Sequence, residues 1–179
     1  RSVRTLAVSI DDLAALLEGG APAVAELLVR GIVEGGFDPA TIYRDAVESA
    51  PAELDEVIVV APGADGAAVA AAAERGRILG EGANLARGLA NRSANDVTPR
   101  VLADEARALA EAHGLSIDVI GPERAAELGM GMFLAVGQGS DNPPRMIVLR
   151  SGPEGATDAQ GRLLALVGKG VCFDSGGIS

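Results

Sequence analysis

The chain has 179 residues, 48% of them hydrophobic, and this composition is typical of a folded protein and not of a disordered one. It carries 25 acidic residues against 15 Lys and Arg, so its net charge of -10 disfavours nucleic acid and anionic membranes as partners. It has no run of roughly 18 apolar residues that could span a bilayer and only one cysteine, Cys172, so we expect a cytoplasmic protein without disulfides.

The first third of the chain has the alternating pattern of an α/β layer. Four elements are predicted there: a strand at Leu6 to Ile10, a helix from Asp11 or Asp12 to Gly19-Gly20, a helix from Pro22 to about Val33, and a buried strand at Val57 to Val60. A long alanine-rich helix then runs from Gly66 to about Leu89. Its internal glycines, each of which costs about 1 kcal/mol against alanine, indicate close packing against another helix or a bend; they are Gly76, Gly80, Gly82 and Gly88.

The second half also alternates helices and strands. Thr98-Pro99 is a strong helix start, because the hydroxyl can cap free N–H groups and proline suits the first helical position. Its helix should end at His113-Gly114. The further predictions are a strand at Leu115 to Ile120, a short helix at Pro122 to Leu128, and strands of the parallel type at Met146 to Leu149 and Leu163 to Val167. We expect Val57 to Val60 and Leu163 to Val167 to be covered on both faces, in separate sheets.

These elements predict an α/β fold in three parts: a partial N-terminal α/β domain over 1–65, a connecting helix over 66–90, and the start of a second α/β domain with a mainly parallel sheet over 91–179. Limited proteolysis should cut near the connecting helix or near Asn91 to Asp96. The chain begins without Met and stops at Ser179, directly after a glycine-rich turn. We therefore expect it to be a piece of a longer protein.

The glycine-rich segment from Val167 to Gly177 contains the residues best suited to chemistry. Lys169 is the only lysine in the chain, whereas all other Lys or Arg positions are arginine. A site that needs a neutral amine explains this choice, because an ammonium can lose its proton and donate a lone pair, which guanidinium cannot do. Asp174 follows five residues later, so an amine and a carboxylate could face one divalent cation. The alternatives are a solvated lysine and an aspartate that caps a turn.

Other catalytic motifs fail in detail. A phosphate-binding P-loop needs four residues between its glycines and Ser or Thr after the lysine, but Gly170 follows Lys169. The chain has no Gly-x-Ser-x-Gly elbow, and its one histidine, His113, is placed to interact with a helix end. The triplet Asn91-Arg92-Ser93 matches a glycosylation sequon and is interpreted as a turn.

The loop around Lys169, with Phe173 to Ser179, resembles the signature metal-ligand segment of the leucyl (cytosol) aminopeptidases. Three upstream segments also resemble that family in order and spacing: Asn84 to Arg87, Asn91 to Pro99, and Gly129 to Ser140 with Pro144-Arg145. The resemblance covers about 75–179 well and 1–65 loosely, where the family has a macro-like α/β domain. Ser93 and Cys172 depart from the family's usual proline and threonine.

The resemblance implies a metalloaminopeptidase with two divalent ions, Mn2+ or Zn2+, that releases leucine-like N-terminal residues from peptides as a homo-hexamer. It implies that Lys169 binds one ion, that Asp174 bridges both, and that the other ligands and the catalytic residues come after Ser179. The 179-residue chain is then expected to be inactive by itself. Two alternatives stay open: a noncatalytic or DNA-associated relative, and a metal-independent α/β domain in which Lys169 binds an anionic small molecule.

Overall fold

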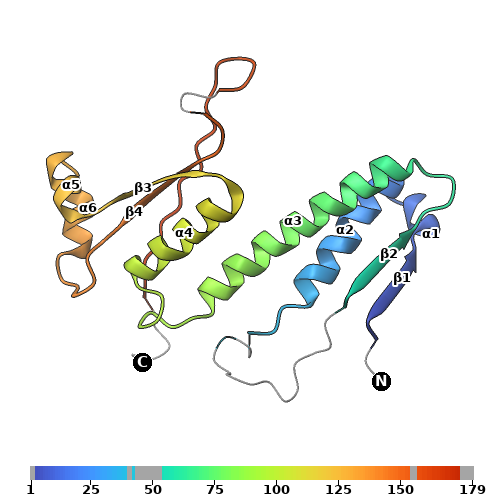
Figure 1. Ribbon diagram of the computed structural model, residues 1–179, viewed down its shortest axis with the longest axis horizontal. Helices are drawn as coiled ribbons and strands as arrows, with labels where there is room; N and C mark the ends of the chain where they lie inside the picture. Colours follow the sequence, from blue (N-terminus) through green and yellow to red (C-terminus); the bar gives the residue numbers. More distant parts are fainter. Residues whose placement is uncertain (1–2, 40–41, 43–53, 154–156, 174–179) are drawn as a thin grey trace. The chain divides into compact units, whose positions relative to one another are not determined.

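A computed structural model of the chain describes residues 3–39, 42, 54–153 and 157–173 (Figure 1). The chain divides into two compact units, with the boundary between Asn91 and Arg92. Both units combine helices with short strands, which confirms the α/β class. In the described residues, no helix is long and apolar enough to cross a membrane.

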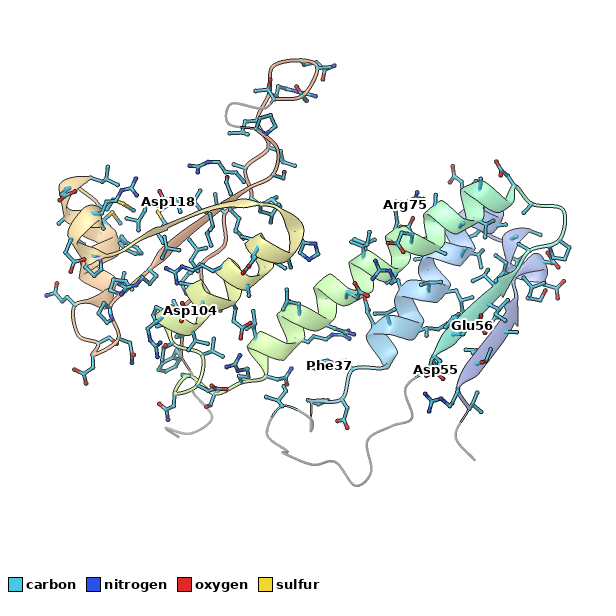
Figure 2. The ribbon with its side chains drawn as sticks, in the orientation of Figure 1. Phe37, Asp55, Glu56, Arg75, Asp104 and Asp118 are labelled. Carbon is cyan, nitrogen blue, oxygen red and sulfur yellow. The ribbon has the colours of Figure 1, made fainter. Side chains whose placement is uncertain are left out.

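The first unit contains a two-stranded parallel sheet and two long helices. Its elements are β1 (Thr5–Ser9), α1 (Asp11–Ala14), α2 (Gly20–Gly35), β2 (Glu56–Val60) and α3 (Gly66–Ala90). Leu6 pairs with Val57 and Val8 with Val59. Where the strands begin, Arg4 donates two hydrogen bonds to Asp55, which is labelled beside Glu56 in Figure 2. The predicted strands and the long connecting helix are therefore present.

The helices that the structure describes cover one face of this sheet. Val8 and Val59 pack against a core of Ile10, Val24, Ala25 and Val69, which lies between the sheet and the helices. On β2, by contrast, Ile58 and Val60 are 42% and 40% exposed. The prediction that β2 is covered on both faces is wrong, because side chains alternate along a strand and the described helices cover one side only.

The two long helices approach closely at two glycines. A Cβ atom placed on Gly76 would lie 2.3 Å from the carbonyl oxygen of Glu26, and one on Gly80 would lie 2.8 Å from the Cβ of Val33. Gly82 and Gly88, in contrast, have nothing within 4 Å of such an atom. The predicted close packing is therefore confirmed at Gly76 and Gly80, and α2 is the partner helix.

The first predicted helix is shorter than expected. It ends at Ala14, and α2 begins already at Gly20. Gly19 and Gly20 both have positive φ values, of 95° and 62°, which reverse the chain between the helices. Leu16 is 80% exposed, so no packing surface stabilises further helical turns after Ala14.

The second unit contains α4 (Pro99–His113), β3 (Ser116–Ile120), α5 (Pro122–Glu127), α6 (Gly131–Gly137) and β4 (Met146–Arg150). The predicted boundaries of α4 are confirmed. The Thr98 hydroxyl accepts a hydrogen bond from the Val101 N–H, and Gly114 ends the helix in the left-handed conformation at φ 64°. The helix α6 was not predicted, because its seven residues contain five apolar side chains in a row and no polar face.

The direction of β4 differs from the prediction. β3 and β4 pair antiparallel, with Ile120 opposite Met146 and Ser116 opposite Arg150. The strand at Met146 to Leu149 is thus confirmed, but its assignment to the parallel type is wrong. An apolar run shows that a strand is covered by neighbours and does not encode its direction, and antiparallel strands also occur in otherwise parallel sheets.

The predicted strand at Leu163 to Val167 is not formed. These residues belong to no helix or strand, and Leu163, Leu164, Leu166 and Val167 are 76% to 97% exposed. A strand needs a neighbour for its backbone hydrogen bonds, and no described strand pairs with this segment. The prediction of burial here is wrong for this chain.

Candidate metal site

Lys169 lies in the exposed stretch that follows Leu163 to Val167. Its flanking residues, Gly168 and Gly170, have open space around them, with nothing within 4 Å of a Cβ atom placed on either. Its side chain makes no hydrogen bond or ion pair with the part of the chain that the structure describes. The amine is therefore accessible to a ligand from solvent.

Asp174, the other predicted ligand, lies outside the described residues. Within the described ranges, no three or more His, Cys, Asp and Glu side chains are grouped so that they could hold a metal ion. An amine is a suitable donor for zinc or manganese, but a single donor does not make a site for either. The described residues thus supply one candidate ligand, and no coordination geometry follows from them.

A tight turn at residues 158–162 comes before this stretch. The Asp158 carboxylate accepts hydrogen bonds from the backbone N–H groups of Gln160 (2.9 Å) and Arg162 (2.8 Å) and from the Arg162 Nε (2.7 Å). The backbone bond from Arg162 and then its side chain hold the pKa of Asp158 below its usual range. Sequence analysis missed this turn, although an aspartate three residues before Gly161, at φ 73°, is a typical turn pattern.

Cys172 is the half-buried residue of the loop. Burial raises the pKa of its thiol, so the sulfur keeps its proton at neutral pH. A thiol in this state packs as a small apolar residue.

A charged cluster at the start of the second unit was also missed. Arg92 donates to both carboxylate oxygens of Asp96, at 2.7 and 3.0 Å, and to Glu105 at 2.9 Å. Its side chain is only 22% exposed. The hydrogen bonds from Arg92, followed by its charge, lower the pKa of Asp96. The spacing of four residues between Arg92 and Asp96 was the available signal, but the triplet at 91–93 was interpreted only as a turn.

A second ion pair connects β3 to α5. Arg124 donates to Asp118 at 2.9 Å, and Figure 2 labels Asp118 on β3. The pair is more than half exposed on the arginine side, where such contacts contribute little. It stabilises the local geometry of the second unit and offers no additional ligand for a cation.

Comparison with known proteins gives consistent matches. The sequence profile described as the catalytic domain of the cytosol aminopeptidase family matches residues 84–179. A protein of Acidobacterium capsulatum named "probable cytosol aminopeptidase" is 40% identical over 158 residues, which is 88% of this chain and 30% of that protein. Its namesake from Solibacter usitatus is 40% identical over 182 residues, covering 100% of this chain and 35% of the relative.

Two solved enzyme structures are similar to this chain. A mutant of tomato leucine aminopeptidase has a TM-score of 0.69 at 29% identity, over 82% of this chain and 29% of that one. The bottromycin maturation enzyme BotP in complex with Mn has a TM-score of 0.64 at 33% identity, over 84% of this chain and 30% of that one. The chain therefore spans about a third of the length of the proteins that it matches.

Proposed function

This chain belongs to the cytosol aminopeptidase family, and from this membership we propose that it supplies the first metal ligands of a metalloaminopeptidase that releases N-terminal residues from peptides. The observation that carries the proposal is the family profile match, because it runs through the loop that contains Lys169 and Asp174. The Mn-bound state of BotP, at 33% identity, supports the choice of a divalent metal.

In this proposal Lys169 binds one of two divalent ions, Mn2+ or Zn2+, and Asp174 bridges both. The ions, when bound, supply Lewis acidity and an activated water. The accessible amine of Lys169 is suited to its role, because the side chain need not break a described ion pair in order to bind.

We further propose that the 179-residue chain alone is inactive. Its described residues offer a single donor, and it spans about 30% of the Acidobacterium relative, so further ligands and catalytic groups would come from the part that it does not match. The complete protein would act in the cytoplasm on peptides with a free N-terminus, prefer leucine-like residues, and assemble as a hexamer.

A chimera tests this function. The chain is joined to the segment that follows the matched region in the Acidobacterium capsulatum protein, and the purified product is assayed for Mn2+ content and for hydrolysis of leucine amide. Lys169→Arg keeps the charge but removes the lone pair, so we expect loss of activity and of one ion. Asp174→Asn should weaken the binding of both ions. Arg100→Lys is the control, because it places a lysine at a position of α4 that is 77% exposed and outside residues 167–177.

Two results would contradict the proposal. One is a Lys169→Arg chimera that retains two tightly bound ions, and this result does not depend on turnover. The other is efficient leucine amide hydrolysis by the unmodified 179-residue chain, which would mean that the ligand set is already complete within it.

A further inference from the structure

The chain is fastened on both sides of the boundary between the two units. On the first side, Asn91 completes α3: its backbone N–H and its side-chain amide both donate to the carbonyl oxygen of Arg87, at 2.9 and 2.8 Å. Side-chain and backbone bonds to the last carbonyl groups are how a helix satisfies its C-terminal end. Asn91 is therefore held at the C-terminal end of α3.

The segment that follows is fastened to α4. The N–H groups of Asp96 and Val97 donate to the Ser93 carbonyl oxygen at 3.0 and 2.9 Å, and the Val97 side chain is 8% exposed. Arg92 then connects this turn to α4 through Asp96 on the turn and Glu105 on the helix. The guanidinium plane of Arg92 is fixed by three hydrogen bonds between charged groups: a bidentate pair to Asp96 and a third bond to Glu105.

The arginines of α4 pair with a different carboxylate from the two that Arg92 contacts. Arg107 donates to Asp104 at 2.5 Å, and Arg100 lies 3.7 Å from the same carboxylate. The two arginines of α4 thus face Asp104, and among the described residues Glu105 accepts its hydrogen bond from Arg92. A lysine at 92 could not replace it fully, because an ammonium is a compact charge and cannot form the planar two-bond contact with Asp96.

We propose that Arg92 is a latch that holds residues 92–98 on α4, so that this segment is part of the folded second unit. Without the latch, the same residues would form a flexible tether of about seven residues. Residues 92–98 are therefore held in a fixed turn, although the sequence alone predicts a protease-sensitive loop from Asn91 to Asp96. This inference rests on the described contacts and is independent of the proposed metal site.

Amide hydrogen exchange measured by NMR on the 179-residue chain tests the latch. In Arg92→Ala we expect the amides of Asp96 and Val97 to exchange on the order of tenfold faster, because the turn opens locally. The amide of Asn91, bonded to Arg87, and the amide of Leu102, bonded to Thr98, should keep their rates. Arg92→Lys should give an intermediate effect, and Arg100→Ala is the matched control that removes an exposed arginine of the same unit.

The amides distinguish the possible outcomes. Unchanged exchange at Asp96 and Val97 in Arg92→Ala would overturn the latch. Equal acceleration at Asn91 would overturn the local role of Arg92, because the loss of its side chain would then also open the end of α3. If Arg92→Ala does not fold, the exchange rates of the same amides are measured in Arg92→Lys and Glu105→Gln. Wild-type rates at Asp96 and Val97 in both variants would refute the proposal.

Discussion

Replacement of Gly76 by alanine is the most direct test of how α2 and α3 pack. The new methyl group would lie 2.3 Å from the Glu26 carbonyl oxygen and 3.1 Å from the Arg30 nitrogen, and both are backbone atoms that cannot rotate away. Ordinary contact begins at 3.4 Å, so the helices must separate by about 1 Å. The adjacent contact between Arg75, labelled in Figure 2, and Glu26 at 3.0 Å would be disturbed as well.

The expected net effect is a loss of stability. Overpacking of this kind costs about 1–3 kcal/mol, and the better helix propensity of alanine returns about 1 kcal/mol. Gly76→Ala should therefore lower the free energy of unfolding by up to roughly 2 kcal/mol. Gly82→Ala is the matched control in the same helix, because its methyl group meets nothing within 4 Å. It should stabilise the chain by up to about 1 kcal/mol.

Thermal unfolding followed by circular dichroism measures both variants. In a unit of this size, the two midpoints should differ by on the order of 10 °C, with Gly76→Ala below the wild type and Gly82→Ala at or above it. If both alanines shift the midpoint equally and in the same direction, the close approach of α2 and α3 at Gly76 is refuted. The measured change would then reflect helix propensity alone.

Two further predictions concern the second unit. Leu166 is 91% exposed, so Leu166→Asp should change the free energy of unfolding of this chain by less than about 0.5 kcal/mol, and a large loss in urea denaturation would show that the segment is buried. The lowered pKa of Asp96, caused by Arg92, stabilises the folded state above the ordinary aspartate pKa of about 4, and this stabilisation is lost as the pH falls through the lower folded value. Urea denaturation should thus find the wild type more stable than Asp96→Asn at pH 7 and nearly equal to it at strongly acidic pH, whereas a pH-independent difference would contradict the ion pair.

The sequence predicted the structure correctly where the stabilising interactions join residues close together in the chain. Thr98-Pro99 and Gly114 define α4 because capping hydrogen bonds and a left-handed glycine act within a few residues. The loop around Lys169 could also be identified from the sequence, because the residue type alone distinguishes an amine from a guanidinium. Its resemblance to the aminopeptidases agrees with the family profile over 84–179.

The tertiary structure decided what depends on neighbours. The four internal glycines of α3 are equivalent in the sequence, yet only Gly76 and Gly80 face α2. Met146 to Arg150 is a strand in either direction, and only its pairing with β3 makes it antiparallel. The apolar run at Leu163 to Val167 has the composition of a buried strand but stays exposed. Burial requires a partner surface that covers the segment, and the segment's own residues cannot supply that surface.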